Sequence, residues 1–491
     1  MLSAPARLCL AAFPGGCRQA VADIARQLGR GAPAWVVGGA VRRVRLGEAV
    51  ADLDVAVPSG ALALGRALAD RLRSAYVLLD ERRGACRVLA SVPIDLTDLR
   101  APSIEDDLRG RDFTVNALAV SLPELVGRGE ATIQDPTGGL RDLAARHVRL
   151  CAPDALEQDP VRVLRAARLA IQPGWSLGAA TEAAMARAAA RTPRVSAERL
   201  REELIGILAT PAAGAGLRLL DRVGAMQALL PESLPMRETA QSAPHRFDVW
   251  EHSLRAVEAA DPLLAELDAL EPWGNALALH LVEDLGDRLT RRELLKLAAL
   301  LHDVAKPETL KIVDGRTRFF EHDRIGAERA TAIAARFRLS GHANAALARL
   351  VRHHLRPMHL AQAGGLTRRA RYRFFQALGE EARDLVLLAL CDAAAVRGES
   401  ALAVWTGPGG ALLRELMRGV EEDAVTATTP PLLRGEDVME AFGLEPGPEV
   451  GRRLGLAREA QALGLVGDRQ SALDYLRRAG DPALDTPGEG P

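Results

Sequence analysis

The stretch Trp35–Val57, WVVGGAVRRVRLGEAVADLDVAV, joins a short apolar run to two glycines and then to an Asp-Leu-Asp motif. Side chains alternate between the two faces of a strand, so Asp52 and Asp54 are predicted to share one face and the apolar residues around them the other. Two carboxylates on one rigid strand can hold one or two Mg²⁺ ions, which neutralise a triphosphate and polarise an attacking oxygen. The stretch therefore predicts a strand with a buried face and a reactive face.

Gly38 and Gly39 lie between this strand and the preceding apolar run. They can form a tight turn at which a phosphate approaches the backbone, and Arg42 can reach that phosphate from the helix turn that follows. Each pattern is also frequent by chance, and the alternative interpretation is a sharp turn beside a solvated pair of carboxylates.

Composition limits the class of protein. A chain of 491 residues predicts roughly three or four domains, and its few aromatics, with abundant Ala and Leu, favour helix. The formal net charge of -1 means that any surface for nucleic acid must be local. The five cysteines form no Cys-x-x-Cys pair, which argues against a disulfide framework or a zinc knuckle and fits a reducing cytoplasm. We expect a cytoplasmic protein without a membrane span, since no long apolar window is present.

The chain divides into two parts by pattern. Residues up to about 150 contain short strand-like runs at Trp35–Val37, Leu53–Val57 and Val88–Leu96, whereas almost everything after Pro153 has a helical pattern. The predicted fold class is therefore α+β, with a small β-sheet head followed by an all-α remainder.

Three more motifs follow in order: DLRGRDFTVNALAV (Asp107–Val120), DPTGGLRDL (Asp135–Leu143) and ALEQDPVRVLRAARLA (Ala155–Ala170). With the opening stretch, they resemble the class II tRNA nucleotidyltransferases, or CCA-adding enzymes, and the related bacterial poly(A) polymerases. The resemblance implies that Asp52 and Asp54 bind metal and act in catalysis, with Asp95 of IDLTDLR as a candidate third carboxylate. It also implies nucleotide contacts for a wider set of residues, namely Gly38, Gly39, Arg42, Arg111, Asp112, Asp159, Arg162, Arg165 and Arg168.

The motif around Asp159 also has a physical interpretation. Asp159-Pro160 is typical of a helix start, and arginines at spacings of three can then converge on one ligand from one helix face. An ordinary N-cap and a solvated face are the alternative. The resemblance implies that Asp159 and Arg162 read the Watson-Crick edge of the incoming base. Because Asp accepts and Arg donates hydrogen bonds, the pair can match C or A.

The sequence departs from the family motifs at three positions. Arg43 replaces the usual Asp of GGxVRD, Gly110 the first Arg of RRD, and Gln158 the Glu of EDxxR. None of these changes removes a metal-binding carboxylate, but the first could disturb the loop beneath a triphosphate and the last could alter how the base-reading helix is held.

The stretch RVSAERLREELIGIL (Arg194–Leu208) resembles the next family motif. Ser196 is predicted to cap a helix, and Glu198, Glu202 and Glu203 are interpreted, with the arginines beside them, as a charged outer face without a chemical role.

A second constellation lies in the helical part. His302-Asp303 occurs in LLKLAALLHDVAKP, a helix expected to stop at Pro307, and two polar residues in an apolar run are costly unless a ligand satisfies them. The series resembles the HD phosphohydrolase superfamily, H…HD…H…H…D. It implies a site for Mg²⁺ or a divalent transition metal that activates water against a phosphoester. The implied ligands are His252, His302, Asp303, His322, His354 and Asp392, with His353 as the alternative to His354, while His280 and His359 fit no position.

The carboxyl-terminal part, Leu432–Leu476, resembles the tail of many bacterial tRNA nucleotidyltransferases. Its turn at Gly443–Pro448 either offers backbone N–H groups to phosphate or only joins two helices. TRRARYRFF (Thr367–Phe375) suits RNA, but a helix with one basic and one apolar face explains it equally well.

These motifs give a provisional map: a nucleotidyltransferase head (1–150), a helical neck with the base-selecting motif (151–215), a connector (216–244), an HD domain (245–405), an RNA-binding tail (406–480) and a frayed terminus (481–491). The expected function is template-independent addition or repair of the tRNA 3′ CCA end from CTP and ATP, with release of pyrophosphate. The expected partners are the tRNA 3′ end and the two nucleotides, with no membrane and no stable protein partner. Three alternatives remain: a narrower or looser polymerase (A-adding, CC-adding or poly(A)-adding), a protein that is mainly an HD phosphohydrolase, and a non-enzymatic RNA-binding protein.

Overall fold

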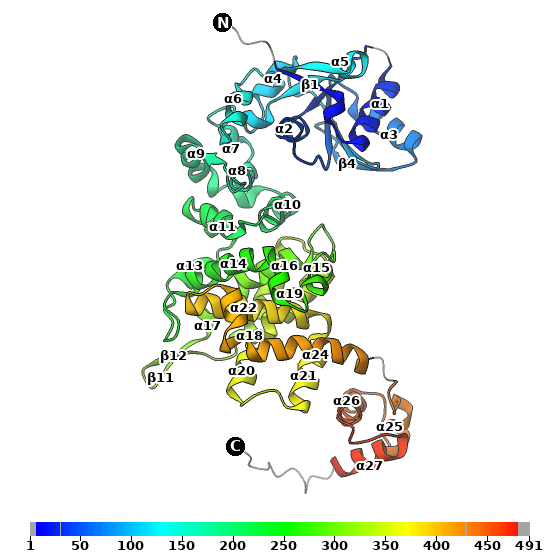
Figure 1. The fold of residues 1–491 in the computed structure, drawn as a ribbon, viewed down its shortest axis with the longest axis vertical. Helices are drawn as coiled ribbons and strands as arrows, with labels where there is room; N and C mark the ends of the chain where they lie inside the picture. Colours follow the sequence, from blue (N-terminus) through cyan, green and yellow to red (C-terminus); the bar gives the residue numbers. More distant parts are fainter. Residues whose placement is uncertain (1–5, 30, 428–429, 480–491) are drawn as a thin grey trace. The chain divides into compact units, whose positions relative to one another are not determined.

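The computed structural model describes residues 6–29, 31–427 and 430–479 (Figure 1). The chain forms two compact units, one of Met1–Thr210 with Ala215–Pro231 and the other of Pro211–Gly214 with Glu232–Pro491. The frayed terminus expected at 481–491 lies outside the described residues.

The first unit contains an eight-stranded sheet of order β1-β8-β7-β2-β3-β6-β5-β4. The α+β class is confirmed. The run Val88–Leu96, however, is not one strand, because Ala90–Val92 form bends and the chain returns antiparallel, pairing Leu89 with Pro93. The strands are β1 (Arg7–Cys9), β2 (Trp35–Val37), β3 (Leu53–Val57), β4 (Ala75–Asp80), β5 (Ala85–Leu89), β6 (Pro93–Asp98), β7 (Ala119–Ser121) and β8 (Glu130–Gln134).

One face of this sheet is covered and supplies the core of the unit. Helix α3 (Ala61–Leu72) packs on β5 and β6, and α1 (Gly15–Leu28) packs on α3. Leu53, Val55 and Leu96 are buried. β3 runs parallel to β6 with Asp54 opposite Asp95, so the polar residues of both strands point to the other face.

The turn between β2 and α2 (Gly39–Leu46) requires glycine. Gly38 has a φ of 70°, and a Cβ on it would lie 3.2 Å from a carboxyl oxygen of Asp54. Glycine thus lets the backbone approach the carboxylate.

The predicted helix start at Asp159-Pro160 is wrong by two residues. Helix α7 (Ala155–Gln158) ends before Asp159, and α8 (Arg162–Ala170) begins after Val161. Asp159 is extended, with φ -144° and ψ 91°, as expected for a residue before proline. The turn that follows is closed by bonds between residues three apart, from Arg162 N–H to the Asp159 carbonyl and from Val163 N–H to the Pro160 carbonyl, so the regular α-helix begins only at Arg162. The other helices of the neck are α9 (Ala179–Ala189), α10 (Ala197–Leu208), α11 (Ala213–Arg222) and α12 (Ala225–Leu229), and those of the head are α4 (Ile104–Arg109), α5 (Leu122–Arg128) and α6 (Gly139–Ala144).

Three short strands also occur among the described residues after Pro153, where the pattern is otherwise helical. β10 (Ser176–Leu177) pairs with β9 (His147–Val148), which precedes Pro153, and β11 (Leu310–Val313) forms a hairpin with β12 (Arg316–Phe319). Asp314 and Gly315 both have positive φ, which is typical of a two-residue hairpin turn.

The second unit is built mainly of helices. At its centre α14 (Val249–Ala265), α16 (Arg291–Leu301) and α22 (Ala382–Arg397) pack against one another, and α18 (His322–Arg336) pairs with α19 (Gly341–His353). The remaining helices of the body are α13 (Ser233–Arg237), α15 (Gly274–Leu281), α17 (Lys306–Thr309), α20 (Arg356–Gln362), α21 (Arg368–Leu378), α23 (Ala401–Thr406) and α24 (Ala411–Ala427).

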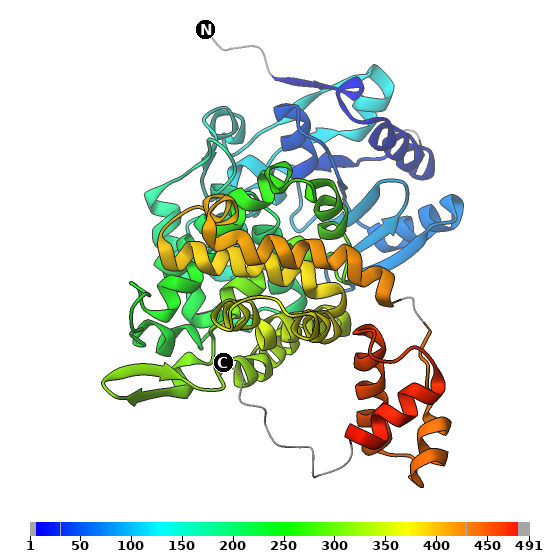
Figure 2. The same cartoon turned by 60° about the horizontal axis from the view of Figure 1, so that its bottom comes forward.

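The tail helices α25 (Gly435–Phe442), α26 (Pro448–Ala462) and α27 (Arg469–Ala479) surround a small apolar core of their own (Figure 2). Across the described ranges, no helix combines the length and apolarity that a membrane span requires.

Candidate functional site

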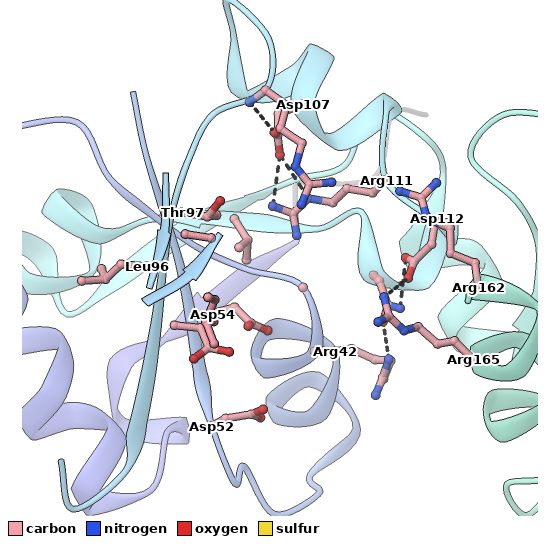
Figure 3. Close-up of a pocket in the computed structure, with 18 of the residues that line it drawn as sticks. Arg42, Asp52, Asp54, Leu96, Thr97, Asp107, Arg111, Asp112, Arg162 and Arg165 are labelled. Carbon is pink, nitrogen blue, oxygen red and sulfur yellow. Dashed lines mark hydrogen bonds and ion pairs between the residues drawn. The ribbon is translucent and has the colours of Figure 1, made fainter. Parts of the chain in front are cut away.

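Three carboxylates meet on the open face of the head sheet. Figure 3 shows two of them, Asp52 and Asp54. Asp54 lies on β3, Asp52 directly precedes that strand, and Asp95 lies on β6; all three line a cavity of about 420 Å³. Burial, and then the charges of Asp52 and Asp95, raise the pKa of Asp54 to about 6. Such a concentration of negative charge favours a divalent cation, and oxygen ligands suit a hard ion.

Arg87, which the sequence did not single out, fixes the orientation of Asp95. It lies opposite Asp95 in the β5–β6 register, and its Nε and a terminal nitrogen donate to the two carboxyl oxygens at 2.6 and 2.7 Å. A planar guanidinium matches a carboxylate in this two-bond arrangement.

Cationic groups line the cavity on the β2 side of the carboxylates. Arg42 is on α2, which directly follows β2, and a terminal nitrogen of Arg111 would lie 3.4 Å from a Cβ on Gly38. Arg165 comes from α8, and Figure 3 shows these three arginines around the cavity. Arg111 donates to Asp107 Oδ2 at 3.0 Å, and Arg42 hydrogen-bonds Asn116. Of the predicted catalytic and nucleotide-binding residues, all but Asp159 line this cavity.

Glu203 corrects the interpretation of the neck helix. The sequence placed it on a charged outer face, but it is buried, with Oε1 accepting from Arg165 Nε at 2.7 Å and Oε2 from Arg168 Nε at 2.8 Å. Glu202 beside it is exposed, because successive residues of a helix point in different directions. Because α10 packs on α8, the face of α10 that carries Glu203 lies against the face of α8 that carries Arg165 and Arg168.

Asp112 completes the same network. It accepts from Arg165 at 2.8 Å and from the backbone N–H of Phe113 at 2.7 Å. Burial disfavours the charged carboxylate, but the charge of Arg165 and these hydrogen bonds hold the pKa of Asp112 at about 2. Arg165 is thus held between two carboxylates, one from the head and one from α10.

Asp159 and Arg162 lie near each other beside the cavity. The Nε of Arg162 is 4.0 Å from Asp159 Oδ2, and Arg162 also donates to the carbonyl of Ala155 at 3.0 Å. Asp159 Oδ2 accepts from Arg199 of α10 at 2.6 Å. The sequence gave no role to Arg199, although its position one turn before Glu203 could have indicated a shared face.

The three departures from the family motifs have different surroundings. Arg43 lines the cavity, so its side chain adds a cation where the motif has an acid. Gln158 donates to Asp154 at 2.8 Å at the exposed end of α7. A Cβ at Gly110 would meet only backbone atoms at ordinary contact distance, so the change there leaves the backbone undisturbed.

In the second unit, the six predicted metal ligands come together as two groups. His252, His302 and Asp392 form one group, and Asp303, His322 and His354 form the other, with the ligand atoms of each group within 4.8 Å of one another. Asp303 lies between the groups: its Oδ2 is 3.2 Å from His302 and its Oδ1 is 3.4 Å from His322.

Hydrogen bonds orient the histidines of both groups toward a common centre. His302, His322 and His354 each place Nδ1 within 2.9 Å of the carbonyl three residues earlier, which directs Nε2 inward. Burial lowers the pKa of His354, which favours the neutral imidazole that binds metals.

The charge of Asp303 supports the same interpretation. Its buried carboxyl oxygens accept no hydrogen bond within the described part of the chain, although the Lys306 ammonium lies 2.6 Å from Oδ2. Despite burial, His302 and Lys306 hold the pKa of Asp303 well below its usual range. The residues therefore fit one or two divalent ions. Lys306 was not predicted as part of the site, whereas His280 pairs with Asp384 elsewhere, at 3.0 Å.

Comparison with known proteins agrees with this geometry. Residues 34–149 match the poly A polymerase head domain, 174–236 the probable RNA and SrmB-binding site of polymerase A, and 249–395 the HD domain. An A-adding tRNA nucleotidyltransferase of Deinococcus radiodurans is 38% identical over 93% of this chain and 96% of its own length. The chain belongs to the tRNA nucleotidyltransferase family. Like this relative, it is an enzyme.

Three further comparisons concern specificity and fold. A CC-adding tRNA nucleotidyltransferase of Thermus thermophilus is 35% identical over 90% of this chain and 93% of its own length. Among solved structures, a CCA-adding enzyme in an apo form has a TM-score of 0.60 at 18% identity, covering 96% of this chain and 97% of its own. The Thermotoga maritima CCA-adding enzyme complexed with tRNA has a TM-score of 0.55 at 18% identity, covering 96% and 99%. At these identities, the structures establish the fold alone.

Proposed function

We propose that this enzyme builds or repairs the CCA end of tRNA from CTP and ATP without a nucleic-acid template. The observation that carries the proposal is the single cavity in which three carboxylates, from β3, β6 and the residue before β3, face several arginines. Phosphoryl-type transfer needs this combination, because its catalysis consists mainly of positioning and of neutralising phosphate charge.

In this proposal, each group of side chains has a defined task. Asp52 and Asp54, with Asp95 beside them, would hold Mg²⁺, and the ion supplies charge neutralisation and activation of the RNA 3′-hydroxyl. Arg42, Arg165 and the other cavity arginines hold the triphosphate, and the glycine turn admits it next to the backbone. The hydroxyl attacks the α-phosphate, and pyrophosphate leaves toward the arginines.

Base selection is assigned to Asp159 and Arg162. Their separation of 4.0 Å allows one acceptor and one donor to meet the same base edge. Arg199, which donates to Asp159, limits the directions in which the carboxylate can accept from a base.

The deciding experiment offers purified protein three tRNA transcripts, ending before the first C, after C and after CC. Each is incubated with CTP, ATP, GTP or UTP singly, and the added ends are sequenced. Full CCA addition predicts C, C and A on the three substrates in turn. Asp54→Asn is the inactive control, and incorporation equal to that of wild type by this variant would show that another site is responsible.

Addition of the terminal A alone is a second candidate. It is favoured by the relative named A-adding, which aligns over nearly its whole length at 38% identity. In the same experiment, this activity predicts AMP incorporation on the transcript ending in CC and no extension of the other two. Extension only by C would instead match the CC-adding relatives.

We also propose that the HD domain is a separate phosphohydrolase. Its support is the two ligand groups that share Asp303. Divalent ions held there supply a water nucleophile at neutral pH. The double variant His302→Ala, Asp303→Ala should lose metal-dependent cleavage of a 2′,3′-cyclic phosphate and keep nucleotide addition. The control variant His359→Ala, which changes an exposed histidine, should keep both activities. If the wild-type protein shows no phosphoesterase activity with Mg²⁺, Mn²⁺, Ni²⁺ or Co²⁺, the proposed hydrolase activity is wrong and the HD domain has a structural role.

A further inference from the structure

The open face of the head sheet has an ordered layout. The strand order β2-β3-β6-β5-β4 places the glycine turn at one side, the carboxylates of β3 and β6 in the middle, and β5 and β4 beyond them. The register aligns one residue from each of the strands β3, β6, β5 and β4. Asp54 on β3 lies opposite Asp95 on β6, Asp95 lies opposite Arg87 on β5, and Arg87 lies opposite Val77 on β4. Side chains paired across strands point to the same face, so all four belong to the face of the active site.

Beyond Arg87 this part of the sheet carries exposed apolar side chains. A register shift between Leu78 and Asp80 leaves Leu79 unpaired and places the polar Asp80 opposite Ala85 at the edge. Val77 and Leu79 on β4 are 38% and 50% exposed, and Leu89 on β5 is 45% exposed. We call these three residues the β4–β5 platform. Leu79 also lines the active-site cavity, so the platform and the cavity are continuous. Exposed apolar residues that gather beside a reactive site are typical of a surface that another molecule covers.

Reaction geometry indicates which molecule this is. In phosphoryl transfer the attacking and leaving oxygens are roughly in line on opposite sides of the phosphorus. The arginines that would hold the leaving pyrophosphate lie on the β2 side of the carboxylates. The attacking hydroxyl must then arrive from the opposite side, where β5 and β4 lie.

We infer that the β4–β5 platform binds the unpaired 3′-terminal nucleotide of the acceptor RNA, with its base against Leu79, Leu89 and Val77. An apolar aliphatic surface packs against any nucleobase, so the platform accepts an RNA end without reading its sequence. This inference rests on the proposed nucleotide addition and specifies where its second substrate lies.

Leu79→Ser and Leu89→Ser test the inference, with Leu78→Ser as the matched control. Leu78 is on the same strand and 46% exposed, but it pairs with Cys86 and so points to the face that carries α3. With tRNA ending in CC, each platform variant should raise the KM for tRNA about fivefold to tenfold, and the KM for the nucleotide less than about twofold. Leu78→Ser should change neither constant. Circular dichroism checks that all variants are folded.

Cross-linking gives a readout that does not depend on turnover. A tRNA with photoreactive 4-thiouridine as its last nucleotide should attach to β4 or β5 of the wild-type enzyme, and Leu79→Ser should weaken that attachment. If the platform variants match Leu78→Ser, if the KM for the nucleotide rises as much as that for tRNA, or if cross-links fall only in the second unit, the inference is wrong. If wild type extends no tRNA, the proposed function itself fails, whereas extension without these effects overturns only the platform.

Discussion

Glu203→Gln is the most informative single change, because Glu203 holds two arginines that line the active-site cavity and does not line that cavity itself. The wild-type carboxylate accepts one bond from Arg165 at 2.7 Å and one from Arg168 at 2.8 Å. An amide keeps the shape of the side chain, but one of its two ends is an NH₂ group that can only donate. One arginine therefore loses its acceptor, and both lose the charge of Glu203, although Arg165 keeps its ion pair with Asp112.

The size of the effect follows from these contacts. A hydrogen bond to a charged group contributes about 1.5–3 kcal/mol, and removing one partner of a buried pair can cost about 3–5 kcal/mol. The side chains of Arg165 and Arg168 are 34% and 28% exposed, so water replaces part of the lost interaction. The range of about 1.5–3 kcal/mol for a hydrogen bond to a charged group therefore applies, not the larger cost of a fully buried pair. We expect a loss of about 1.5–3 kcal/mol, which corresponds to roughly a 10- to 150-fold decrease in kcat/KM for the nucleotide.

The assay measures AMP and CMP incorporation at varied nucleotide concentration, with denaturant unfolding of the same preparations. Glu202→Gln is the control, because this neighbour is exposed. Glu203→Gln should lower kcat/KM for the nucleotide and leave the KM for tRNA nearly unchanged, because the arginines face the nucleotide side of the cavity. A Glu203→Gln enzyme with the kinetics and stability of Glu202→Gln would refute the reasoning.

Three other predictions concern neighbouring residues. Asp54→Asn should leave the fold intact, as judged by circular dichroism, and reduce incorporation at least ~100-fold, because metal-borne charge stabilisation is lost. Arg162→Ala should relax base choice by about ten- to a hundredfold, measured as UTP and GTP misincorporation, and a variant that loses only overall rate would assign Arg162 to positioning. Asp112→Asn should lower stability by about 2 kcal/mol at pH 6, because the folded-state pKa is depressed. The stability contributed by the Asp112 carboxylate is fully present above the ordinary pKa of 3.8 and is lost as the pH falls toward about 2. The free energies of unfolding of wild type and Asp112→Asn, measured with denaturant, should therefore become more alike as the pH falls through this range, and a growing difference would contradict the prediction.

The sequence by itself determined the chemistry of both sites. The Asp-Leu-Asp alternation located the reactive strand face, since the two-residue period of a strand is a local property of the backbone. In the HD domain, two polar residues in an apolar run indicated His302 and Asp303, and the resemblance to the HD superfamily implied the other four ligands; the structure brings all six together. Helical content after Pro153 was similarly readable from composition and periodicity.

The sequence did not show which charged residues hold the site. Glu203 and the exposed Glu202 are chemically alike and adjacent, so local pattern could not show that Glu203 turns toward α8. Arg87 likewise gained its role from pairing with Asp95, which depends on strand register. Such pairings join residues that are distant along the chain.

Only the tertiary structure decided the geometry of the active face. The order β2-β3-β6-β5-β4 places the glycine turn after β2, the carboxylates and the β4–β5 platform side by side, although their order along the chain is different. Periodicity gives the face on which a residue lies, but strand order depends on which strands pair, and pairing is set by packing of the whole sheet. For that reason the two carboxylates could be predicted from one short stretch, while the β4–β5 platform, which we infer receives the RNA end, required the fold.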